Sequence, residues 1–335
     1  MSLTSTAARL KRYGIDRYML LLAGTIIAAT LLPAQGGTAS VLRGVSFWAI
    51  AVLFFLYGAK LSTATILAGL TNWRLQFGVL ACTYLLFPVL GLGLGLASAP
   101  ILGASFAAGL IYIGCLPSTV QSAVAFTSLA RGNVAGAVCA ASISNLIGVV
   151  LAPLLVALLL TTDGSVAVNP DAVWKIVQQI LLPFFAGQLC RPLLARLLER
   201  FRTLVTVYDR AAILLIVYVA FSAGTVDGIW SVAGPGLIAG LIAVVIVMLA
   251  LAMAATLALG RVSGMAGADR VTLLFCGSTK SLATGLPMAG ILFAGQDVAM
   301  IVLPLMLYHL IQLIVCAALA QRAAQTPDGG LFATP

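Results

Sequence analysis

Charged residues are scarce in this chain. Only 8% of its 335 residues are Asp, Glu, Lys or Arg, and 62% are hydrophobic. A soluble globular domain carries roughly 25% charged residues, so an ordinary soluble protein is excluded. Apolar runs of about 18 or more residues, each long enough to cross a bilayer, recur from Tyr18 to Ala320. The sequence therefore predicts an all-α polytopic membrane protein embedded in a lipid bilayer.

Acids, histidine and paired cysteines are rarer still. Nine acids and one histidine stand against 18 basic residues, and the spans predicted below leave all nine acids in loops, in tails or within the first two residues of a span. No Ser-His-Asp, paired-carboxylate or HExxH arrangement falls within those spans, which argues against an enzyme. The six cysteines form no CxxC pair, so we expect no disulfide and no metal site. We expect no cofactor, no nucleic-acid partner and, without a P-loop, no ATP-driven transport.

Apolar segments divide the chain into ten expected spans. The fourth and ninth are long, and both carry a polar interruption. With boundaries good to about two to four residues, the spans lie at 18–33, 43–59, 75–96, 101–129, 134–160, 172–190, 208–224, 234–260, 268–293 and 297–320.

Basic residues predict the orientation of these spans. With the N-terminus in the cytoplasm, 15 of the 18 Lys and Arg residues fall on the cytoplasmic side, whereas only Arg43 and Lys175 fall outside. Basic residues concentrate in the cytoplasmic loops of membrane proteins. We therefore expect a bacterial inner-membrane protein with two cytoplasmic ends, a segment at 1–17 and a tail at 322–335.

The chain also has the pattern of an internal duplication. Five spans at 18–160 precede a polar extracytoplasmic linker at 161–171, and five spans at 172–321 follow it. The interrupted span is the fourth in each half. Because five is odd, the second half enters the membrane inverted relative to the first. Inverted repeats with paired discontinuous helices are typical of secondary transporters, whose site lies between the repeats.

The two interruptions supply the candidate site. Pro117 breaks the fourth span and Gly277 is expected to break the ninth, where Lys280 lies deep in an apolar segment. An ionisable side chain at that depth marks a functional site. Helix packing through hydroxyls is the alternative for each Ser and Thr. The candidate residues for binding substrate or ion are Ser118, Thr119, Ser122, Asn145, Ser278, Thr279, Lys280 and Ser281.

Three further polar positions are interpreted as follows. His309, on the tenth span, is either a proton relay or a hydrogen-bonded core residue. Lys60, near the end of the second span, is expected to extend its ammonium to the membrane surface. Arg131, with Gly132 and Asn133, is either an anchoring turn or a gate for substrate.

These motifs resemble those of a known family. The residues that carry the resemblance are Cys115-Leu116-Pro117, Leu129–Asn133, Phe275–Leu282 followed by Gly285-Leu286-Pro287-Met288, Pro304–His309 and Phe54–Leu61. They are similar to bile acid:sodium symporters, and most similar to the SBF-like branch that contains solute carrier family 10 member 7 and its bacterial relatives. The resemblance covers about residues 15–322.

The resemblance implies a fold of ten helices in two inverted five-helix repeats. Spans 1, 2, 6 and 7 would form a panel domain, and the others a core domain in which the discontinuous helices 4 and 9 cross. Sodium-coupled relatives have a glutamate in the ninth span at the position of Phe275, and their following asparagine aligns with Lys280. Because no carboxylate replaces these ligands, sodium is left open as the coupling ion.

The leading hypothesis is a secondary transporter that moves a small organic anion by alternating access. Lys280 would supply a fixed positive charge for the anion, would occupy the place of a sodium ion, or would bind and release a proton. The alternative for Lys280 is a structural residue that pairs with carbonyl oxygens. The alternative, implied by the resemblance, is a regulatory membrane protein that affects calcium homeostasis without transport of its own. The sequence predicts neither the substrate nor the oligomeric state.

Overall fold

The computed structural model describes residues 17–60, 72–161, 177–294 and 296–325, and all secondary structure in these ranges is helical. The predicted linker at 161–171 and the two predicted ends lie outside them, except for Thr161, Arg17 and residues 322–325. The elements are α2 (Arg17–Leu31), α3 (Gly36–Lys60), α5 (Trp73–Ala81), a π-helical turn η2 (Cys82–Leu86), α6 (Phe87–Leu102), α7 (Ala104–Cys115), α8 (Gln121–Leu129), α9 (Val134–Thr161), a second π-helical turn η3 (Val177–Leu181), α11 (Leu182–Arg200), α12 (Arg202–Val226), α13 (Ile229–Val232), α14 (Pro235–Val262), α15 (Gly267–Ser278), α16 (Leu282–Leu292) and α17 (Val298–Gln325).

Seven of the described segments are long and apolar enough to cross a membrane. They are Gly36–Lys60, Trp73–Leu102, Val134–Leu160, Gln178–Arg200, Arg202–Val226, Pro235–Val262 and Val298–Gln325. Two further apolar helices, Leu20–Leu31 and Ala104–Cys115, are shorter. A multi-pass membrane protein is therefore confirmed, whereas the count of ten spans and the inverted repeats stay predictions.

Several predicted boundaries differ from the structure: α3 begins at Gly36 rather than at 43, α6 ends at Leu102 rather than at 96, α12 begins at Arg202 rather than at 208 and α17 ends at Gln325 rather than at 320. The largest difference is at the sixth span. The sixth span was expected to end at residue 190, but α11 continues to Arg200. Leu and Arg are good helix formers, so the helix need not end where the apolar run ends. The continued part carries Arg191, Arg196 and Arg200, which were expected in a loop.

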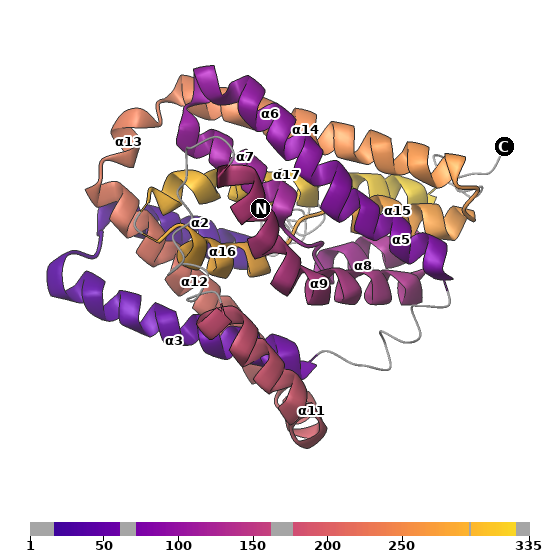
Figure 1. Ribbon diagram of the computed structural model, residues 1–335, viewed down its shortest axis with the longest axis horizontal. Helices are drawn as coiled ribbons and strands as arrows, with labels where there is room; N and C mark the ends of the chain where they lie inside the picture. The colour runs from indigo at the N-terminus through magenta and orange to yellow at the C-terminus, as the bar shows by residue number, and fades with distance from the viewer. Residues whose placement is uncertain (1–16, 61–71, 162–176, 295, 326–335) are drawn as a thin grey trace, which may run out of the picture.

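The helices pack in two groups (Figure 1). Helices α2, α3, α11 and α12 contact one another and form what we call the panel group. The core group consists of α5 to α9, with η2, and α14 to α17, in which α6 packs on α7 and α7 on α17. Figure 1 shows α3 and α11 crossing on one side of the molecule, with α6 and α14 on the other.

The panel group is held by a close crossing of α3 and α11. Gly58 lies against the backbone of α11, where a Cβ would overlap the Phe184 carbonyl oxygen. Gly187 lies against α3 in the same way, and a Cβ there would overlap the Phe55 carbonyl oxygen. Small residues let membrane helices approach to backbone contact. These two glycines therefore fix how the panel group packs.

The core group is joined at one end by Asp269. Its Oδ1 accepts from Asn133 Nδ2 at 2.8 Å, and its Oδ2 accepts from Asn72 Nδ2 at 2.9 Å. The carboxylate thus connects the start of α15 to the α8–α9 turn and to the start of α5. This position supports the anchoring reading of Arg131-Gly132-Asn133. Arg131 itself is exposed and adopts a positive φ of 58° in that turn.

Candidate functional site: two helix interruptions and a cavity

The two helix interruptions are in direct contact. One lies between the end of α7 at Cys115 and the start of α8 at Gln121, and the other between Ser278 and Leu282. The Ser281 N–H donates to the Pro117 carbonyl at 3.0 Å. Ser118 Oγ donates to the Cys276 carbonyl at 2.6 Å. Backbone groups freed by each break are therefore satisfied by the other, as a low-dielectric interior requires.

Pro117 lies in its break as predicted, but Gly277 does not. Leu116 is extended, with φ −79° and ψ 152°, because a following proline disfavours the helical conformation. Gly277 instead lies inside α15, and that helix ends at Ser278. A Cβ on Gly277 would come within 3.0 Å of Thr256 Cγ2. The glycine thus allows close packing of α15 on α14, and the expectation that it breaks the helix was wrong.

Lys280 is fully buried at the meeting point of the two breaks. Its Nζ donates to the carbonyl oxygens of Leu116 at 2.6 Å, Thr83 at 3.0 Å and Gly114 at 3.3 Å. The same ammonium lies 4.1 Å from the centre of the Phe87 ring. Gly114 and Leu116 are at the C-terminal end of α7, where the helix dipole favours a positive charge. The Lys280 nitrogen therefore lies in a cage of three carbonyl oxygens and one aromatic ring.

Gln312 of α17 holds the backbone of the second break. Its Oε1 accepts from the Lys280 N–H at 2.8 Å, and its Nε2 donates to the Lys280 carbonyl at 2.9 Å. The same amide lies 2.8 Å from Nδ1 of His309. His309 Nδ1 is also 3.4 Å from the Lys280 carbonyl. The only histidine of the chain thus contacts the residues that hold the break in place.

Asn145 of α9 connects the two breaks from the other side. Its Nδ2 donates to the Ser118 carbonyl at 2.8 Å, and its Oδ1 accepts from Thr284 Oγ1 at 3.1 Å. Thr284 lies in the first turn of α16, where Ser281 caps the helix by accepting from the Thr284 N–H at 3.2 Å. An amide with both a donor and an acceptor can bridge two such segments.

A cavity of about 680 Å³ lies between the panel and core groups. The first turns of α8 and α16 open onto it through Thr119, Gln121, Ser122, Ser281 and Thr284. Its wall is completed by apolar side chains from both groups. These are Phe54, Val120, Ala125, Phe126, Val138, Leu146, Val149, Phe184, Ile213, Leu282, Ala283 and Leu313.

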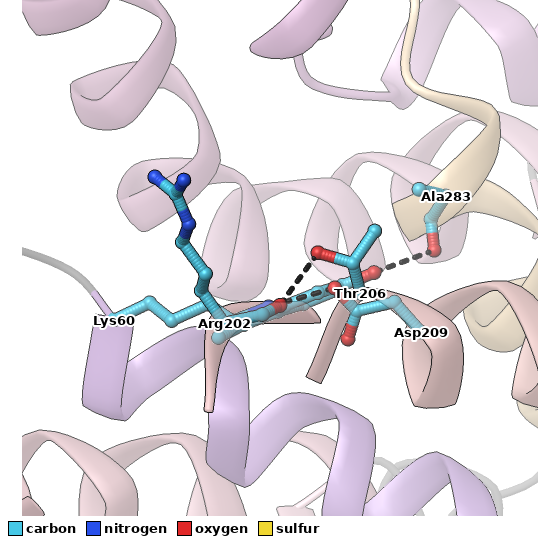
Figure 2. A network of polar contacts seen from close by, with 6 residues as sticks. Lys60, Arg202, Thr206, Asp209 and Ala283 are labelled. Atoms are coloured by element: carbon cyan, nitrogen blue, oxygen red, sulfur yellow. Dashed lines mark hydrogen bonds and ion pairs between the residues drawn. The ribbon is translucent and has the colours of Figure 1, made fainter. Parts of the chain in front are cut away.

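The panel side of the cavity carries an ion pair (Figure 2). Lys60 Nζ lies 2.7 Å from Asp209 Oδ2, and the two side chains are 37% and 18% exposed. Tyr57 donates from its hydroxyl to the Ala283 carbonyl of the core group at 3.4 Å. Arg210 lines the same wall and lies 5.3 Å from the Tyr18 ring centre.

This ion pair corrects one expectation. Asp209 was expected in a loop or at the edge of a span, but it lies inside α12 and lines the cavity, where Lys60 compensates its charge. The expectation that Lys60 extends its ammonium to the membrane surface stays a prediction, and the ammonium pairs with Asp209. The sequence around Asp209 does not indicate that its partner is Lys60, which is 149 positions away in the chain.

The candidate residues divide into two sets. Thr119, Ser122, Asn145, Ser281 and His309 line the cavity. Ser118, Ser278, Thr279 and Lys280 are buried at the contact between the breaks and are not among the cavity-lining residues. Sequence reasoning missed Tyr57, Asp209, Thr284 and Gln312 as parts of the site. Polar residues inside the second, seventh, ninth and tenth expected spans were the signal that could have indicated them.

Comparison with known proteins agrees with this architecture. The model of the SBF-like CPA transporter family matches residues 16–325. "Uncharacterized protein PA2026" of Pseudomonas aeruginosa is 48% identical over 95% of each chain. "Putative symporter YfeH" of Escherichia coli (strain K12) is 42% identical over 92% of each chain.

An animal relative covers nearly the same length. "Sodium/bile acid cotransporter 7" of Mus musculus is 30% identical over 92% of this chain and 93% of its own. The resemblance to the SBF-like branch of bile acid:sodium symporters is confirmed. With two helix interruptions in contact beside a cavity and a family match along almost its whole length, the chain belongs to the SBF-like CPA transporter family.

Proposed function

We propose that this transporter carries a small amphipathic organic anion, which binds in the cavity between the panel and core groups. The observation that carries the proposal is the convergence of two helix N-termini, those of α8 and α16, on that cavity. The first N–H groups of a helix lack intrahelical partners, and the helix dipole adds positive potential there. A carboxylate, sulfonate or similar group is the natural ligand of such a site.

Side-chain charges on the wall favour the same ligand. Lys60 and Arg210 are cationic, and Asp209 is the only carboxylate among the described residues that line the cavity. Phe54, Phe126 and other apolar side chains cover much of the remaining wall. The volume falls within the roughly 300–1,000 Å³ of small-molecule sites. An anionic head group on an apolar body would match both parts of this wall.

Movement of the panel group against the core group would expose the cavity to each side of the membrane in turn. We infer ten spans in two inverted repeats, with both termini in the cytoplasm, from the matched interruptions and the distribution of basic residues. Reporter fusions at Met1 and Pro335 test this inference. Opposite locations for the two ends would show an odd number of spans and contradict the inverted repeat.

We further propose that transport is independent of sodium. The Lys280 ammonium occupies a cage of carbonyl oxygens and an aromatic ring, which already contains a positive charge. Lys280 is not among the residues that line the cavity. In our proposal it therefore acts on the anion only indirectly, by holding the backbone carbonyls of Thr83, Gly114 and Leu116 in place. We assign direct binding of the anion to Lys60, Arg210 and the N-termini of α8 and α16 instead.

Flux into liposomes that contain only this protein tests the proposal. Taurocholate is a suitable first probe, because it is an amphipathic anion and relatives are named as bile acid cotransporters. We expect uptake that is equal in sodium and choline buffers. Arg210→Gln should weaken taurocholate binding about tenfold or more, since a hydrogen bond to a charged group contributes about 1.5–3 kcal/mol.

Arg261→Gln is the matched control, because Arg261 is exposed and is not a cavity-lining residue. It should leave binding unchanged. Folded protein that transports none of a panel of organic carboxylates and sulfonates would contradict transport of an organic anion. Uptake that rises steeply with sodium would instead contradict only the sodium independence.

A further inference from the structure

The carboxylate of Asp209 depends on a single cation. Its Oδ2 binds Lys60 Nζ at 2.7 Å, whereas its Oδ1 is buried without a hydrogen-bond partner among the described residues. Buried charges are compensated by a partner or become neutral. The charge on Asp209 is therefore maintained chiefly by Lys60.

The other titratable groups around this wall donate no hydrogen bond to the Asp209 carboxylate among the described contacts. They are Tyr18 of α2, Tyr57 of α3, Tyr208 and Arg210 of α12, and His309 of α17. The Tyr57 hydroxyl donates to Ala283, and the Tyr208 hydroxyl donates to the Ala49 carbonyl at 3.0 Å. Arg210 lies over the Tyr18 ring, and His309 contacts Gln312 across the cavity. No residue of the α8 or α16 first turns that line the cavity is titratable.

Lys60 is also a cation that an anionic ligand in the cavity can bind. It lines the cavity and is more exposed than Asp209, so a ligand can approach the ammonium from the open side. The ligand and Asp209 would then compete for one positive charge. If the ligand takes Lys60, Asp209 is left with an uncompensated charge in a poorly solvated wall, because its carboxylate has no second cation among the described contacts.

We propose that Asp209 is the proton-binding group of the transport cycle. When the substrate anion takes Lys60, the carboxylate that loses its partner accepts one proton from the aqueous side to which the cavity is open. When the anion leaves on the other side, Asp209 releases that proton there and pairs with Lys60 again. The site thus moves one proton with each anion. This inference rests on the proposed function, since it assigns the coupling ion to the same cavity.

Charge balance supports this order of events. Before binding, the Lys60 ammonium, the Arg210 guanidinium and the Asp209 carboxylate sum to one positive charge. After binding, the same two cations, a monovalent anion and a neutral carboxylic acid also sum to one positive charge. A change of net charge in a low-dielectric wall is costly, so a cycle in which the loaded and empty sites carry the same charge avoids that cost in both directions.

Calorimetric titration of the purified protein with taurocholate in choline buffers tests the proposal. Repeating the titration in buffers of different ionisation enthalpy counts the protons taken up. Wild type should take up about one proton for each taurocholate bound, and its affinity should rise about tenfold for each pH unit lowered in that range. Asp209→Asn should bind taurocholate with no proton uptake and with an affinity that does not depend on pH.

Two further variants complete the test. Asp227→Asn, in the turn after α12, should take up protons as wild type does. Lys60→Met leaves Asp209 protonated before the ligand arrives, so it should bind more weakly and without proton uptake. Binding by wild type with no proton uptake, or unchanged uptake by Asp209→Asn, would overturn this inference while leaving anion transport intact. Wild type that binds no organic anion would overturn the proposed function and this inference with it.

Discussion

Gln312 pairs with the backbone of Lys280 as a neighbouring strand would. The amide accepts from the Lys280 N–H at 2.8 Å and donates to the Lys280 carbonyl at 2.9 Å. A residue in a helix interruption has no i−4 or i+4 partner for these groups, and an unpaired buried group is costly. One side chain from α17 thus makes an interrupted helix possible inside the core group.

Gln312→Leu should therefore destabilise the protein markedly. The change removes the side-chain amide and leaves two buried backbone groups unpaired, at about 1–3 kcal/mol for each. Thermal unfolding in detergent measures the effect. Gln296→Leu is the control, because Gln296 is exposed in the α16–α17 connection, and it should unfold near the wild-type temperature. Equal unfolding temperatures for the two variants would show that the two hydrogen bonds from Gln312 to the Lys280 backbone do not stabilise the protein.

The carbonyl cage around the Lys280 ammonium predicts a gain of cation binding when the ammonium is removed. In Lys280→Ala the oxygens of Thr83, Gly114 and Leu116 would still point at the vacated position. A small monovalent cation can occupy it, and binding to the native state alone raises the unfolding temperature by mass action. We expect Lys280→Ala to be less stable than wild type in choline chloride and to be partly restored by sodium or potassium chloride.

The wild-type protein is the reference for that measurement. Its unfolding temperature should be the same in sodium and choline salts at equal ionic strength, because the cage is already filled. A wild-type protein stabilised strongly by sodium would show a separate sodium site. An alanine variant that responds to no cation would show that the cage collapses without the ammonium.

The crossing of α3 and α11 predicts a severe effect of one methyl group. Gly58→Ala or Gly187→Ala would place a Cβ against a backbone carbonyl, which cannot move aside as a flexible side chain does. Overpacking of this kind costs about 1–3 kcal/mol or more. The folded yield after detergent extraction should fall for both. Gly93→Ala should fold normally, since nothing lies within 4 Å of that position.

Pro117→Ala separates the helix interruption from simple packing. The proline keeps Leu116 extended, and its carbonyl accepts from Ser281, so it shapes the first break and its contact with the second. Alanine permits a regular helix, which would withdraw these backbone groups from the site. We expect transport to fall more than folded yield, measured on the same preparation. Normal transport by this variant would show that the break is only a packing kink.

The sequence by itself determined the class of the protein and the place of both helix interruptions. Apolar runs longer than a bilayer is thick require helices, because the backbone must satisfy its own hydrogen bonds in lipid. Pro117 and the Ser/Thr-rich stretch around Lys280 could be recognised as breaks because proline and small polar residues act locally. The motifs around them were specific enough to indicate the family.

Only the tertiary structure decided what each polar side chain contacts. Lys280 lies in one break, yet its ammonium binds carbonyls of α7 and η2 rather than the cavity. Asp209 and Lys60 are 149 positions apart and meet because α12 and α3 pack side by side. Gly277 could not be distinguished from a helix breaker until Thr256 was placed beside it. Direction and distance between elements far apart in the chain depend on packing, and no local pattern contains them.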